Sequence, residues 1–182
     1  MKKLSTQQLC NDAMLIAIYF VLAKLTIPIG NLHITLASLP IVVLAVLQGP
    51  GHACLVAFLG EFVIQALGRY GLTLLTPLWC LPPTLRALVV GLGCRWLCKG
   101  REREHMVSFF AVTIVAAMLT TVANTLVIWF EATIYGYYTW VYVFGQFLVR
   151  LLTGVVTAVV VSILALPVVR VLRRVHLTRR RR

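Results

Sequence analysis

The sequence predicts an all-α integral membrane protein, a bundle of six transmembrane helices with a short extended loop between helices 1 and 2. Of its 182 residues, 60% are hydrophobic and 12% are charged, whereas soluble domains average about 45–50% apolar and about 25% charged residues. The mean hydropathy is +0.93, and several apolar runs approach the length of about 20 residues that a membrane-spanning helix needs. We expect a single transmembrane domain over residues 1–182.

Prolines, glycines and one serine delimit the predicted helices in order along the chain. Pro28 helps to end the first helix, and Ser38 is expected as the N-cap of the second, with Pro40 in its first turn, where a missing N–H group costs little. The tight turn Gly49-Pro50-Gly51 separates the second helix from the third, and Pro82 begins the fourth. Long apolar runs define the last two. The six helices are expected at residues 11–29, 36–48, 52–67, 82–98, 106–131 and 140–171.

The positive charges predict the orientation of this bundle. Lysine and arginine concentrate on the cytoplasmic side of membrane proteins, and with six crossings all but four of the 17 basic residues fall on one side. If the short second segment did not cross, the KGRERE sequence at residues 99–104 would face outward while the N-terminus faced inward. We expect a multi-pass protein of the plasma membrane with both termini cytoplasmic. The net charge of +12 is interpreted as contact with anionic lipid head groups, without a nucleic-acid partner.

Motifs for catalysis or metal binding are missing from the sequence. Cys94 and Cys98 share a helix face, but no second pair of ligands accompanies them, so we expect no metal site. The sequence has no nucleotide-binding glycine-rich loop, no HExxH motif and no Ser/His/Asp set with a suggestive placement. We therefore expect neither catalytic residues nor a cofactor, and an enzyme is disfavoured.

Polar residues inside the predicted helices indicate a binding pocket. Ionisable groups in membrane helices are energetically costly and usually face the interior of the bundle. Glu61 and Gln65 are four residues apart and share one helix face, as do Gln146 and Arg150. Together with Asn124, they fall in the outer half of the membrane in the six-helix topology. We expect them to converge on an outward-opening pocket, although Asn124 would equally suit a hydrogen bond between helices.

Arg86 lies one turn inside the fourth predicted helix, where two interpretations are open. It forms either a structural ion pair with Glu61 beneath the pocket or a contact with a ligand. The intramembrane and outer-half charges comprise more cations than carboxylates, and an unpaired charge in a medium of low dielectric constant is costly. We therefore hypothesise an anionic, carboxylate-bearing ligand, with Arg150 as its partner and Gln146 beside it. The cations are Lys24, Arg69, Arg86 and Arg150, and the carboxylates are Glu61 and Glu131.

Aromatic residues gather in the predicted outer loops, above all in the sequence YGYYTWVY at residues 135–142. Tryptophan and tyrosine commonly form a belt at the membrane interface, and aromatic faces also suit a flat heterocycle. If these residues contact a heterocyclic ligand, Trp79 and Tyr138 would flank it.

Two stretches carry a resemblance to a known family. Residues 13–62 contain AMLIAIYFVLAKLTIPIGNLHITL and a GP turn before the third helix, and residues 76–86 read TPLWCLPPTLR. With its size, six helices and basic cytoplasmic ends, the chain resembles the substrate-binding S components of energy-coupling factor (ECF) transporters. These are bacterial vitamin importers, and the resemblance is to their folate- and pantothenate-type branch.

This resemblance implies a function in vitamin uptake. Such S components bind a small water-soluble B-type vitamin, such as folate or pantothenate, at the outer face with very high affinity. They then associate with a transmembrane coupling subunit and two cytoplasmic ATPase subunits, topple in the membrane and release the vitamin inside. The loop between the first two helices gates the site, here with His33, Ile34 and Thr35. Small residues on the first helix, here Ala13 and Ala17, dock to the coupling subunit.

Two other functions stay open from the residues alone. A stand-alone secondary carrier for a small organic solute would more often show an internal repeat with broken helices, and the sequence contains no convincing repeat. A small integral membrane enzyme would need a nucleophile, a set of metal ligands or paired carboxylates. An S component is therefore the favoured interpretation.

Overall fold

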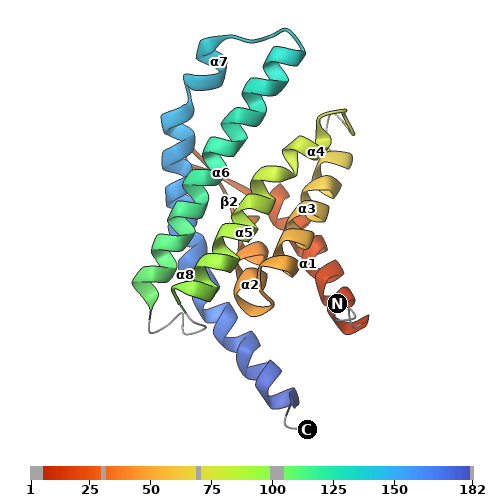
Figure 1. The fold of residues 1–182 in the computed structure, drawn as a ribbon, viewed down its shortest axis with the longest axis vertical. Coiled ribbons are helices and arrows are strands. Elements are labelled where there is room, and N and C mark those ends of the chain that lie inside the picture. Colours follow the sequence, from red (N-terminus) through yellow and green to blue (C-terminus); the bar gives the residue numbers. More distant parts are fainter. Residues whose placement is uncertain (1–5, 30–31, 69–70, 99–104, 181–182) are drawn as a thin grey trace.

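The computed structural model describes residues 6–29, 32–68, 71–98 and 105–180. Its helices form one bundle, in which α1 (Thr6–Lys24) begins and α8 (Phe147–Arg180) ends at the same end (Figure 1). Between them follow, in chain order, β1 (Thr26–Ile29), β2 (Leu32–Thr35), α2 (Ser38–Leu47), α3 (Pro50–Ala66), α4 (Thr76–Trp79), α5 (Leu81–Trp96), α6 (Met106–Ile134) and α7 (Trp140–Phe144).

Six of these helices correspond to the six predicted segments. α1, α2, α3, α5, α6 and α8 each overlap one predicted apolar run, so the predicted order of helices is confirmed. Within the described residues, three helical stretches are long and apolar enough to cross a membrane, at Thr76–Trp96, Met106–Ile134 and Trp140–Arg173, and α2 and α3 are shorter apolar helices. The last predicted segment is divided into α7 and α8 near Gly145, a residue type that weakens helices.

The segment between α1 and α2 is a β-hairpin. β1 and β2 pair in antiparallel fashion, with Pro28 opposite His33, which confirms that this segment is extended. The prediction that the first helix continues to residue 29 was wrong, because α1 ends at Lys24 and Pro28 lies within β1. Proline is tolerated there because both strands of a two-stranded sheet are edge strands. β2 contacts both α1 and α8, so the hairpin bridges the bundle.

α2 forms the centre of the bundle. Its residues from Ile41 to Ala45 are all buried, and it packs against α3, α5 and α8. A helix that is hydrophobic on all sides is typical of such a buried position, which explains why a helix of 10 residues suffices here. Its start differs from the prediction, because Ala37 occupies the N-cap position in place of Ser38, and no side chain caps the helix.

The outer surface of the bundle is apolar. Large hydrophobic side chains are exposed on α1, α6 and α8, among them Met14, Val115, Leu126, Leu152 and Ile163. Contiguous exposed apolar surface marks contact with a membrane or with a partner protein. Together with the hydropathy of the chain, it indicates that lipid surrounds these helices.

Glycine lets α5 pack closely against the start of α3. The turn before α3 has a φ of 94° at Gly49, a conformation that favours glycine, and Pro50 then begins the helix. A Cβ atom on Gly91 of α5 would lie 2.7 Å from the Cα atom of Pro50. A larger residue at position 91 therefore has to push two backbones apart.

We expect Gly91→Ala to lower the free energy of unfolding by about 1–3 kcal/mol, the usual effect of overpacking a close contact. The matched control is Gly51→Ala, because a Cβ atom on Gly51 would meet nothing within 4 Å. Thermal unfolding of the detergent-purified variants measures the difference. Equal unfolding midpoints for the two variants would show that α3 and α5 can move apart to fit the added methyl group without loss of stability.

Candidate substrate-binding site

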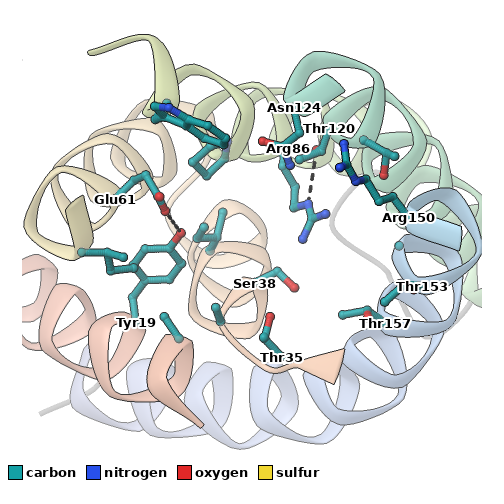
Figure 2. Close-up of a pocket in the computed structure, with 18 of the residues that line it drawn as sticks. Tyr19, Thr35, Ser38, Glu61, Arg86, Thr120, Asn124, Arg150, Thr153 and Thr157 are labelled. Carbon is teal, nitrogen blue, oxygen red and sulfur yellow. Dashed lines mark hydrogen bonds between the residues drawn. The ribbon is translucent and has the colours of Figure 1, made fainter. Parts of the chain in front are cut away.

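A cavity of about 620 Å³ lies in the half of the bundle opposite the chain termini. Its walls come from the last turns of α1, from β2, from the start of α2, from the end of α3 and from the adjoining parts of α4, α5, α6 and α8. Figure 2 shows these elements as a ring around an open centre. The volume falls within the range of about 300–1,000 Å³ that is typical of small-molecule sites.

One side of the cavity carries a carboxylate that is bound by two neutral donors. The Tyr19 hydroxyl of α1 donates a hydrogen bond to Glu61 Oε2 at 2.8 Å, and Gln65 Nε2 donates to Glu61 Oε1 at 2.9 Å. A Cβ atom on Gly60 would collide with the Tyr19 ring, so this glycine lets α1 approach α3. The predicted spacing of Glu61 and Gln65 thus produces a direct contact, which Tyr19 completes from another helix.

The opposite side of the cavity carries two arginines from different helices. Arg86 of α5 points into the cavity and donates a hydrogen bond from Nε to Thr120 Oγ1 of α6 at 3.3 Å (Figure 2). Thr120 in turn donates to the carbonyl oxygen of Ala116 at 2.6 Å, which orients its hydroxyl. Arg150 of α8 also lines the cavity, and its Nη1 atom is buried without a hydrogen-bond partner among the described residues. Positive charge therefore accumulates on this side.

The interpretation of Arg86 as the ion-pair partner of Glu61 was wrong. Among the residues that the structure describes, no ion pair joins these two side chains. Both carboxylate oxygens of Glu61 already accept hydrogen bonds from neutral groups, and Arg86 turns toward α6 instead. Arg86 therefore connects α5 to α6 rather than to α3, and its guanidinium group faces the cavity.

The structure brings most of the predicted site residues together around this cavity. The predicted residues in its wall are Thr35, Glu61, Gln65, Trp79, Arg86, Asn124, Gln146 and Arg150. Tyr138 does not line the cavity, because it lies between α6 and α7 with 43% of its surface exposed. His33 and Ile34 lie in β2. The ammonium group of Lys24 lies 5.5 Å from the centre of the Phe20 ring, and Arg69 falls outside the described residues.

The aromatic residues that follow α6 contact one another. The rings of Tyr135 and Tyr137 stack with 6.5 Å between their centres, and Tyr137 meets Tyr142 edge-on at 5.6 Å. Burial and the nearby Glu131 carboxylate raise the pKa of Tyr137, so Glu131 interacts with this cluster. Such an exposed cluster fits an aromatic belt at the membrane interface better than a ligand site.

Several hydroxyl-bearing residues of the cavity were missed from the sequence. They are Tyr19, Ser38, Thr120, Thr121, Thr153 and Thr157. Hydropathy alone does not separate such residues from their apolar neighbours within a helix. Spacing could have found two of them, because Thr153 and Thr157 follow Arg150 by three and seven residues and so share its helix face.

Both the sequence and the fold resemble known membrane proteins. A family model described as ECF-type riboflavin transporter, S component, matches residues 3–174. Among solved structures, the S component of a bacterial ECF transporter has a TM-score of 0.62 and 21% sequence identity, over 92% of this chain and 96% of that chain. The S component for biotin from an ECF-type ABC transporter has a TM-score of 0.59 and 19% identity, over 92% of this chain and 91% of that chain. No protein of curated function matches the sequence significantly.

These structural similarities confirm the predicted fold class, an all-helical membrane protein with six helices. At identities this low they bear on the fold alone.

We expect Tyr19→Phe to lower the free energy of unfolding by about 1.5–3 kcal/mol, because hydrogen bonds to charged groups contribute about that much. The matched control is Tyr138→Phe on the exposed segment after α6, which should change stability by less than about 0.5 kcal/mol. Thermal unfolding of the purified variants compares the two. If Tyr19→Phe unfolds at the same temperature as Tyr138→Phe, the hydrogen bond from Tyr19 to Glu61 does not stabilise the fold.

Proposed function

Since the chain belongs to the family of ECF-type riboflavin transporter S components, whose model covers residues 3–174, we propose that it captures a riboflavin-type vitamin in the cavity. The branch expected from the sequence, that of folate and pantothenate, was wrong, because the matching model names riboflavin. As an S component, the chain is a membrane transporter subunit and not an enzyme.

The observation that carries this proposal is the mixed lining of the cavity. Trp79, Ile41 and Ile128 supply apolar surface, while Asn124 and Gln146 supply amide groups that both donate and accept hydrogen bonds. Riboflavin combines a flat heteroaromatic ring with polar edges and a hydroxylated chain. An aromatic face suits such a ring, and a small number of placed polar groups orients a ligand within an otherwise apolar pocket.

The position of the cavity supports capture from outside the cell. The cavity is lined by the last turns of α1 and the first turns of α8, whereas the chain termini lie at the other ends of these helices (Figure 1). The distribution of lysine and arginine favours cytoplasmic termini. Thr35 lines the cavity, and β2 contacts α8, which supports the proposal that the hairpin with His33 and Ile34 gates the cavity. Release into the cell would then require a transmembrane coupling subunit and two cytoplasmic ATPase subunits, the partners expected for an S component.

The surface of α1 supports a docking site for the coupling subunit. Ala13 and Ala17 are exposed and lie four residues apart, which places them on one helix face. Met14 and Ile18 are also exposed beside them. Small residues on a membrane helix let another helix approach closely, so this face is suited to a helical partner.

We expect riboflavin to bind the purified protein saturably, as measured by quenching of flavin fluorescence after removal of copurified ligand. Trp79→Ala should weaken binding about 2- to 12-fold, because an aromatic contact contributes about 0.5–1.5 kcal/mol. Trp96→Ala is the matched control, since Trp96 is the last residue of α5, does not line the cavity and is 74% exposed. Binding of thiamine or pyridoxine without binding of any flavin would contradict the proposal.

We expect Ala17→Trp to prevent assembly with the coupling subunit while vitamin binding is retained, because a bulky side chain blocks close helix approach. Ala111→Trp on α6 is the matched control, since Ala111 is exposed on a different helix. Copurification of the coupling subunit measures assembly, and flavin fluorescence measures binding in the same samples. Normal assembly together with lost binding would rule out docking through α1.

A further inference from the structure

Hydrogen-bond donors are left unused on the arginine side of the cavity. A guanidinium group carries five N–H donors and no acceptor. The structure gives Arg86 one hydrogen bond, from Nε to Thr120, and leaves Arg150 Nη1 buried without a partner among the described residues. Figure 2 shows Arg86 and Arg150 on the same side, across the cavity from Glu61.

The hydroxyl groups beside these arginines already donate elsewhere. Thr120, Thr121 and Thr153 each donate to a backbone carbonyl oxygen of their own helix, at 2.6, 3.0 and 2.7 Å. Their oxygen atoms can then act only as acceptors toward a ligand. The strongest donors that this side offers to a ligand are therefore the two guanidinium groups.

The charges of the cavity wall do not balance. The charged residues that line it are Glu61, Arg86 and Arg150. Glu61 is already satisfied by neutral donors, and in the described part of the chain neither arginine forms an ion pair with a carboxylate. An unpaired charge removed from water is costly, so a ligand that brings a negative charge stabilises this arrangement.

We propose that the ligand of this cavity carries an anionic group, a carboxylate or a phosphate monoester, that binds between Arg86 and Arg150. Guanidinium groups bind both kinds of oxyanion through paired, charge-assisted hydrogen bonds. The inference rests on the proposed function, because it concerns the same cavity and takes the vitamin to be a flavin. Riboflavin itself is neutral, so the inference changes the expected cargo to an acidic flavin.

Three flavins that share one ring system and one side chain test this inference. They are riboflavin, riboflavin 5′-phosphate and the acid in which the terminal side-chain alcohol is oxidised to a carboxylate. Fluorescence quenching gives the dissociation constant of each for the full-length purified protein. We expect at least one acid to bind about tenfold or more tightly than riboflavin, since charge-assisted hydrogen bonds are roughly twice as strong as neutral ones. The preferred acid identifies the oxyanion that the site takes.

Substitutions at Arg150 show whether the preference arises in the cavity. Arg150→Gln should lower the preference for the acid several-fold, because only Arg86 then remains to bind the oxyanion, while Arg150→Lys, which keeps the charge but not the planar fork, should retain more of the preference. Arg95→Gln is the matched control, since Arg95 is exposed at the far end of α5, and it should keep the full preference. Circular dichroism verifies that each variant is folded.

Binding of riboflavin as tight as that of both acids, or a preference for an acid that Arg150→Gln leaves undiminished, would overturn the inference. If none of the three flavins binds, the proposed function fails, and the anion site is then tested without a vitamin. Thermal unfolding is compared in inorganic phosphate, acetate and chloride at equal ionic strength. We expect phosphate or acetate to raise the unfolding midpoint of the wild type more than that of Arg150→Gln. An unchanged wild-type midpoint would overturn the inference by this second route.

Discussion

The partners of the Glu61 carboxylate decide how charge is arranged in the bundle. A carboxylate inside a membrane protein needs hydrogen-bond donors, because an unpaired charge away from water is costly. Tyr19 and Gln65 supply these donors at 2.8 and 2.9 Å, and both are neutral. The acid is therefore satisfied without an arginine, and Arg86 reaches α6 instead. Because Glu61 binds only neutral donors, its negative charge stays separated across the cavity from the positive charges of Arg86 and Arg150 (Figure 2).

The walls of the cavity depend on places where helix backbones approach closely. Gly60 leaves room for the Tyr19 ring between α1 and α3, and a Cβ atom on Gly154 of α8 would lie 2.9 Å from Thr121 Oγ1 of α6. Small residues at such crossings are typical of membrane helices, because lipid supplies little force to drive helices together and close contact has to supply it. The same glycines that pack the bundle thus position side chains that line the cavity.

The order of helices and much of the cavity wall could be predicted because they follow from local patterns. Apolar runs define the helices, and a spacing of four residues places Glu61 beside Gln65. The partner of Arg86 could not be predicted, because α5 packs against both α3 and α6 and the partner depends on which of these helices the side chain faces. The apolar residues up to Ile29 are continuous with the first helix in hydropathy, although the β-branched Thr26, Ile27 and Ile29 also suit a strand, and their pairing with β2 appears only once the hairpin forms. Composition likewise could not show that Tyr138 lies away from the cavity, or which vitamin branch the family model would name.

α1 links the cavity to the surface proposed for docking. Tyr19 lines the cavity, whereas the two exposed alanines of α1 face outward. Two polar contacts join α1 to α3, one from Tyr19 to Glu61 beside the cavity and one between Asp12 Oδ2 and His52 Nδ1, at 2.9 Å, nearer the end that bears the termini. Because these contacts lie two turns apart along α1, they resist both sliding and rotation of α1 against α3. A change at the cavity would therefore reach the proposed docking surface as a joint movement of α1 and α3, which would couple ligand binding to docking.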